Sequence, residues 1–165
     1  MPVRGASRRL VHPAMIGGAL LWVSLSSVAG ELPGVADSER AETNYMLHCQ
    51  GCHGPHGEGN ARAQVPRMQG FVGSFLKVQG GRAFLVQVPG SANAALSDAA
   101  LAELLNWMLP TMSANEMPAD FVPYDAEEVA GLRRSREADI HTRRTALIEA
   151  IRLQDQAIPT AESSP

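Results

Sequence analysis

The chain has 165 residues, of which 45% are hydrophobic and 19% are charged, and its formal net charge is −3. The first 30 residues hold three of the 14 basic residues and none of the 17 acidic ones, so removing them leaves a more acidic chain. An acidic chain without a cluster of basic and aromatic residues excludes a nucleic-acid-binding class. The length suits one small domain with an appendage.

The N-terminal segment has the pattern of a signal peptide. Arg4, Arg8 and Arg9 form a positive start, residues 14–28 are largely apolar, and Ser27-Val28-Ala29 is a small-x-small cleavage signal. An apolar stretch of about 15 residues is shorter than the ~20 that span a bilayer. We therefore expect residues 1–30 to be removed on export to the periplasm. The alternative is an uncleaved leader that anchors the protein to a membrane.

The first helix of the mature chain is expected to begin at Asp37 or Ser38, since both residue types cap helices. Helical spacing relates Ala41, Tyr45, His48, Cys49 and Cys52. Both cysteines should therefore lie near the C-terminal end of this helix, which a glycine-rich run then breaks.

The motif Cys49-Gln50-Gly51-Cys52-His53 ends this helix, and Cys-x-x-Cys-His is the attachment signature of a c-type haem. The two thiols form the covalent bonds to the haem, and the histidine binds the iron as proximal ligand. The alternatives are weaker. A thioredoxin-like redox pair requires a βαβ setting, and a structural zinc site requires four ligands, whereas Cys49 and Cys52 are the only cysteines.

The rest of the chain favours an all-α fold. Residues 55–89 are rich in glycine and proline and predict turns, with one short helix at 72–78. Ser97 is expected to cap a helix that ends near Leu109, before Pro110. Its apolar residues Leu101, Leu104, Leu105 and Met108 follow helical spacing and predict a buried face.

Residues 111–165 form a C-terminal extension. Two helices are expected there, one opening at Asp125 and running to about Arg134, and one over 139–155. Residues 121–124 should pack onto the core, and residues 159–165 look disordered. The extension is interpreted as a clasp on the core, with a docking arm for a larger oxidoreductase as the alternative.

Residues 37–109 together resemble class I cytochrome c. The resemblance rests on the haem motif, the Leu-Ser-Asp start of the last core helix, and Pro66-Arg67-Met68-Gln69-Gly70, which matches the family's Pro-x-Leu-x-Gly element with Met68 in the leucine position. It implies a cytochrome c domain at 31–110 with one covalent haem c and its iron. It also implies that the Pro66 carbonyl orients His53, and that Trp107 packs near the haem.

One departure concerns the sixth iron ligand. The family usually has a Met-Pro pair before the last core helix, whereas this chain has Val88-Pro89, and valine has no donor atom. Met108 and Met68 are candidate replacements, and the remaining candidates are Met112, Met117, a histidine or an open site. His48 and His56 lie too close to the motif to reach the opposite face, and His141 is expected on a solvated helix position.

The expected function is one-electron transfer in the periplasm, without catalysis of a substrate reaction. The resemblance implies redox partners such as a periplasmic dehydrogenase and a terminal oxidase. Val88 motivates the alternative of a five-coordinate haem that binds NO, CO or peroxide as a sensor or weak enzyme. A third hypothesis is a subunit whose haem is one stop in a fixed relay.

Overall fold

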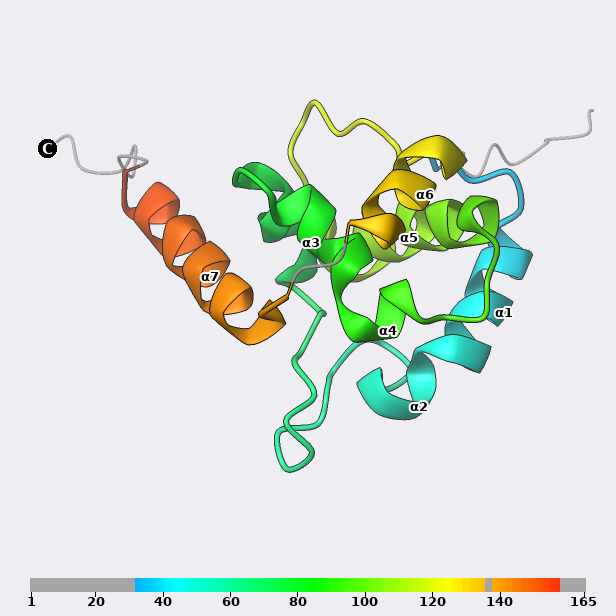
Figure 1. The fold of residues 1–165 in the computed structure, drawn as a ribbon, viewed down its shortest axis with the longest axis horizontal. Coiled ribbons are helices and arrows are strands. Elements are labelled where there is room, and N and C mark those ends of the chain that lie inside the picture. Colours follow the sequence, from blue (N-terminus) through cyan, green and yellow to red (C-terminus); the bar gives the residue numbers. More distant parts are fainter. Residues whose placement is uncertain (1–31, 136–137, 158–165) are drawn as a thin grey trace, which may run out of the picture.

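The computed structural model describes residues 32–135 and 138–157, and within these ranges the chain forms helices and loops with no β-strand. The all-α prediction is therefore confirmed. The helices are α1 Ser38–His48, α2 Gln50–His53, η1 Val72–Lys77, α3 Gly81–Gln87, α4 Pro89–Ala92, α5 Asp98–Ser113, η2 Ala114–Glu116, α6 Ala126–Arg134 and α7 Ile140–Ala157 (Figure 1). None of the described helices is long and apolar enough to cross a membrane. The predicted signal peptide and residues 159–165 lie outside the described residues.

α1 begins where its capping residue predicts. The Asp37 carboxylate accepts a hydrogen bond from the Arg40 N–H at 3.0 Å, and Ala41 and Tyr45 form the buried face of the helix. The prediction of one helix through both cysteines is wrong, because α1 ends at His48 and the backbone of Cys49 leaves the helical region (φ −126°). Cys52 instead lies in the one-turn helix α2.

α5 is the central helix of the core. Ser97 caps it as predicted, by accepting a hydrogen bond from the Ala100 N–H, and Leu101, Leu104, Leu105 and Met108 are all buried. The predicted end at Pro110 is wrong, because the helix continues to Ser113. The extra turn is held by side-chain hydrogen bonds: the Ser113 hydroxyl accepts from the Gly73 N–H, 40 residues away, and donates to the nearby Glu116 carboxylate.

α1 and α6 pack against α5 (Figure 1). Polar contacts from α5 hold the neighbouring segments in place. Glu103 accepts hydrogen bonds from the Arg40 guanidinium and from the backbone N–H groups of Ala36 and Asp37. The buried Asn106 amide accepts from the Tyr124 N–H and donates to the Gly34 and Tyr124 carbonyls. The start of the described chain and the segment that precedes α6 are thereby tied to one helix.

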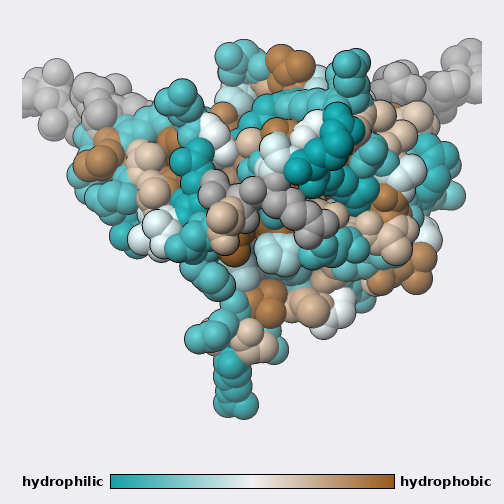
Figure 2. All heavy atoms as spheres, viewed as in Figure 1, coloured by the Kyte–Doolittle hydropathy of each residue, from teal (hydrophilic) through white to brown (hydrophobic). Residues whose placement is uncertain are grey.

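The middle of the chain is more helical than its glycine content predicts. Residues 54–71 form the expected loop, which projects from the body of the protein and is mostly hydrophilic at its tip (Figures 1 and 2). The short helix expected at 72–78 is present as η1. α3 and α4 were not predicted, because Gly80-Gly81 and Pro89 suggested turns. The prolines and glycines instead lie at helix starts, with Gly80 at a left-handed φ of 82° and Pro89 in the first turn of α4.

The extension packs onto the core. Asp125 caps α6 as predicted, by accepting from the Glu128 N–H at 2.8 Å. Tyr124 is buried, and Arg82 of α3 lies over its ring while pairing with Glu128 at 2.6 Å. α7 contacts α3 and η1. The division into a domain at 31–110 and an extension at 111–165 stays a prediction, and α5 runs across that boundary without a break.

Candidate functional site

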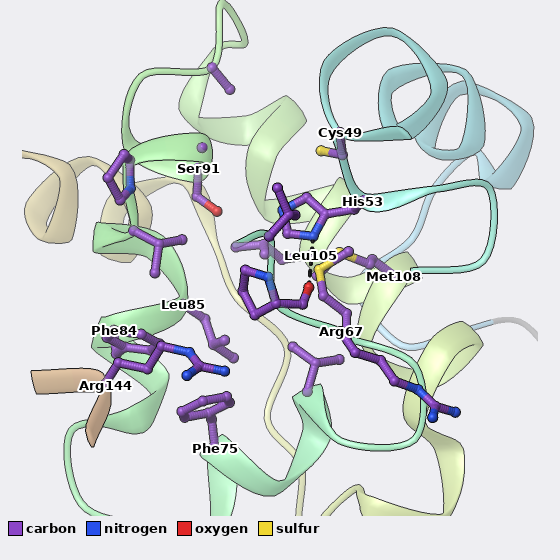
Figure 3. Close-up of a pocket in the computed structure, with 18 of the residues that line it drawn as sticks. Cys49, His53, Arg67, Phe75, Phe84, Leu85, Ser91, Leu105, Met108 and Arg144 are labelled. Carbon is purple, nitrogen blue, oxygen red and sulfur yellow. Dashed lines mark hydrogen bonds between the residues drawn. The ribbon is translucent and has the colours of Figure 1, made fainter. Parts of the chain in front are cut away.

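A cavity of about 770 Å³ lies between the loop that follows α2 and the helices α3, α4, α5 and α7 (Figure 3). Its volume is in the range of roughly 300–1,000 Å³ that small-molecule and cofactor sites occupy. Its walls are mainly hydrophobic, which suits a large apolar ligand with few polar anchors. The cavity is lined by Cys49 and His53 of the Cys-x-x-Cys-His motif and by His48, which directly precedes the motif.

The two cysteines differ in their surroundings. Cys49 is half-buried at the junction of α1 and α2, and burial followed by the nearby Cys52 raises the pKa of its thiol to about 11. Cys52 is exposed and does not line the cavity. Both thiols are free, with no disulfide between them, as covalent addition to a cofactor requires.

His53 is oriented by the backbone. Its Nδ1 lies 3.2 Å from the carbonyl oxygen of Pro66. Because a carbonyl oxygen only accepts hydrogen bonds, Nδ1 carries the proton, and the lone pair of Nε2 is available as a metal ligand. Burial also lowers the pKa of His53, so the ring favours the neutral form that binds metals.

The Pro66 carbonyl is held in place by close backbone packing against the haem-motif loop. The Gly59 N–H donates to the His53 carbonyl at 2.8 Å, and the N–H groups of Met68 and Gln69 donate to the Gly57 carbonyl at 2.8 and 3.0 Å. A Cβ on Gly59 would meet the backbone of residues 65–67 at 2.7 Å, and φ there is +73°. Glycine at this position therefore permits the contact that orients His53.

The wall across the cavity from His53 comes from α3 and α4, with Leu85 and Ser91 (Figure 3). Val88 lies between these helices and also lines the cavity. The segment from Gly81 to Ala92 contains no methionine and no histidine. The Ser91 hydroxyl is the polar side-chain group of this wall.

The methionine candidates lie elsewhere. Met108 and Met68 both line the cavity, and Figure 3 places Met108 on the same side as His53. Met112 is buried, and it lies near Met68 because both side chains pack against Gly57. A Cβ added to Gly57 would be 2.8 Å from the Met112 Sδ and 3.2 Å from the Met68 Cβ. Met117 is half-buried in the core and does not line the cavity. Trp107, which the resemblance places near the haem, does not line the cavity. It packs on Tyr45, with ring centroids 5.9 Å apart.

The histidines outside the motif separate into two groups. His48 lines the cavity near Cys49, whereas His56 is exposed and does not line it. His141 of α7 is exposed and also lines the cavity, together with Ile140 and Arg144. Sequence reasoning missed Arg144 because a charged residue on a predicted amphipathic helix is usually assigned to its solvated face.

A haem fits the residues that are present. The free thiol of Cys49 and the oriented imidazole of His53 lie on one hydrophobic cavity of suitable volume. The alternative of a structural zinc site finds no support, since the described part of the chain holds no group of three or more His, Cys, Asp or Glu side chains arranged for a metal ion.

Comparison with known proteins gives one informative match. The chain is 28% identical to cytochrome c-552 of Thermus thermophilus over 123 residues, which covers 64% of this chain and 82% of that protein. No family model and no solved structure matches the chain. This similarity to a cytochrome c agrees with the resemblance that the haem motif and the Pro66–Gly70 element carry.

Proposed function

We propose that this protein is a monohaem c-type cytochrome that carries single electrons between redox partners in the periplasm. The proposal rests on one observation: Cys49, His53 and the Pro66 carbonyl lie together at one hydrophobic cavity. When bound, a haem supplies a one-electron couple between ferrous and ferric iron. The similarity to cytochrome c-552 supports the same function at the level of the family.

The chain's own residues bind and tune the cofactor. Cys49 and Cys52 hold it covalently, and His53 binds the iron through Nε2. The hydrogen bond from His53 Nδ1 to Pro66 fixes the ring plane and raises the basicity of the ligand, which favours ferric iron. Hydrophobic residues such as Leu85, Leu104 and Phe75 exclude water from the cavity. A redox centre in such surroundings changes charge with little rearrangement of solvent.

The predicted leader supports a periplasmic location, since the covalent haem motif is completed outside the cytoplasm. The partners then belong to the electron-transfer chains of that compartment. A dehydrogenase that donates electrons and a terminal oxidase that accepts them are the classes we propose.

The proposal is tested on the full chain expressed with its leader in a host that attaches haem c. We expect a covalently bound haem that titrates as a single reversible one-electron couple and exchanges electrons with a periplasmic redox protein. A purified protein without covalent haem, or with a haem that is not reversibly reduced, would contradict the proposal.

The wall formed by Leu85, Val88 and Ser91 favours a second candidate function, the binding of a small ligand to five-coordinate haem iron. In this wall, Leu85 and Ser91 lie across the cavity from His53 (Figure 3). The wall has no thioether or imidazole, and the Ser91 hydroxyl offers a hydrogen-bond donor to a diatomic ligand. Addition of CO to the ferrous protein separates the two functions. A rapid spectral change favours ligand binding, and an unchanged spectrum favours electron transfer with a sixth ligand from the protein.

A further inference from the structure

The first turns of α7 form part of the cavity wall, although they belong to the extension that the class I resemblance does not cover. α7 packs on α3 and η1 through the buried residues Leu147 and Ile151. Arg144 precedes these residues by three and seven positions, so it lies on the same face of the helix. It is half-buried and lines the cavity. A cation thus occupies a position in the apolar stripe of α7.

Two half-buried arginines on other helices are paired with carboxylates, whereas Arg143 is half-buried without a carboxylate partner among the described residues and lies against Gly80, outside the cavity. Arg82 pairs with Glu128 at 2.6 Å, and Arg133 pairs with Asp98 at 2.9 Å. Within residues 32–135 and 138–157, no carboxylate forms an ion pair with Arg144. A guanidinium against hydrophobic walls is costly unless an anion compensates its charge. The unpaired cation in the cavity therefore indicates an anionic group on the ligand.

The position of Arg144 identifies which part of the ligand it meets. Figure 3 shows Cys49 at one end of the cavity and Arg144 at the other, near Phe75, with its guanidinium extending toward the interior. In haem c the two propionate carboxylates extend from the porphyrin edge opposite the edge that carries the thioether bonds. A cofactor anchored at Cys49 would direct its carboxylates toward the end where Arg144 lies.

We propose that Arg144 binds a propionate of the haem, so that α7 forms part of the cofactor site. A guanidinium presents two parallel N–H donors that match a carboxylate, which suits arginine to this role. Arg67 lines the same cavity, but its guanidinium donates to the Gln69 side chain at 3.2 Å. The inference rests on the proposed binding of haem c. It adds that the extension contributes directly to the cofactor's electrostatics.

The test compares Arg144→Gln, Arg144→Lys and Arg143→Gln in the full-length, haem-loaded protein. Arg143 is the matched control, because it is also a half-buried arginine of α7 but lies against Gly80 and does not line the cavity. Loss of a positive charge near the iron destabilises the reduced state relative to the oxidised one. We expect a lower midpoint potential for Arg144→Gln, a smaller decrease for Arg144→Lys, and no change for Arg143→Gln.

Amide hydrogen exchange of residues 140–151 accompanies the potentiometry and shows whether α7 stays packed. We expect faster exchange in Arg144→Gln, because the propionate bond helps to hold the helix. An Arg144→Gln protein with the wild-type potential and wild-type exchange would overturn the inference, as would equal potential shifts in the Arg143 and Arg144 variants. If Arg144→Gln does not fold, Arg144→Lys decides: it must shift the potential, and a wild-type value overturns the inference. Failure of the proposed function gives a different result from failure of this inference, since the wild-type protein would then carry no covalent haem.

Discussion

The Nδ1–H of His53 donates a hydrogen bond to the carbonyl oxygen of Pro66, 13 residues later in the chain, at 3.2 Å. This bond fixes the tautomer of the imidazole and leaves Nε2 free. It depends on the packing of the Pro66 backbone against Gly59. The residues on the proximal side of the candidate haem site are therefore held in place by contacts within the chain itself.

Replacing Gly59 with valine should break this arrangement. A side chain there would collide with the backbone of residues 65–67 at 2.7 Å and would require a left-handed backbone conformation. The His53 ligand would lose its acceptor and become less basic, so we expect a higher midpoint potential in the haem-loaded protein. Gly131→Ala is the control, because a Cβ on Gly131 meets nothing within 4 Å. Equal potentials in both variants would contradict the account.

Asn106→Leu should destabilise the fold without touching the cavity. Asn106 is 1% exposed and satisfies the N–H and the carbonyl of Tyr124, which the leucine would leave without partners. We expect the free energy of unfolding to fall by about 2–4 kcal/mol, since each buried unsatisfied group costs roughly 1–3 kcal/mol. Urea denaturation followed by circular dichroism measures the change. The exposed Asn115→Leu is the control, and an effect as large as that of Asn106→Leu would argue against this assignment.

Acid should destabilise the protein partly through Glu103. The hydrogen bond from Arg40, with those from the backbone N–H groups of Asp37 and Ala36, holds the pKa of Glu103 below its ordinary value of 4.5. A lowered pKa in the folded state adds stability above the ordinary pKa, and that stability is lost as the pH falls through the folded value. Glu103→Gln should therefore flatten the decline in the free energy of unfolding below about pH 4.5.

Urea midpoints between pH 6 and 3 provide this measurement. Glu127→Gln, which removes an exposed carboxylate of α6, serves as the control and should keep the steep decline of the wild type. A Glu103→Gln protein with an unchanged pH profile would show that this carboxylate is not coupled to folding.

Val88→Met should restore a potential iron ligand on the wall across from His53. Val88 lines the cavity between α3 and α4, and the class I resemblance leads us to expect methionine in this Val-Pro pair. If the wild-type ferrous protein binds CO, we expect the Val88→Met protein to bind it at least tenfold more weakly, since a thioether on the iron competes with CO. Val122→Met, on an exposed position, should leave CO binding unchanged.

The helix starts at Asp37, Ser97 and Asp125 were predictable because they depend on local chemistry. The haem motif stays a prediction that rests on the same kind of local signal. A thiol pair followed by histidine has few other uses, and a capping side chain reaches only the first turn of its helix. The continuation of α5 past Pro110 was not predictable, since Ser113 gains its bonds from Gly73 and Glu116. The place of Arg144 was missed for the same reason, because only the packing of α7 on α3 turns it toward the cavity.

The intact mass of the protein, purified after export from a host that attaches haem c, tests the central claim most directly. The account predicts the mass of the processed chain plus one haem, which denaturation does not release, and a loss of that addition when Cys49 and Cys52 are both changed to alanine. A mass equal to the polypeptide alone, with both thiols still free to react with an alkylating reagent, would contradict it.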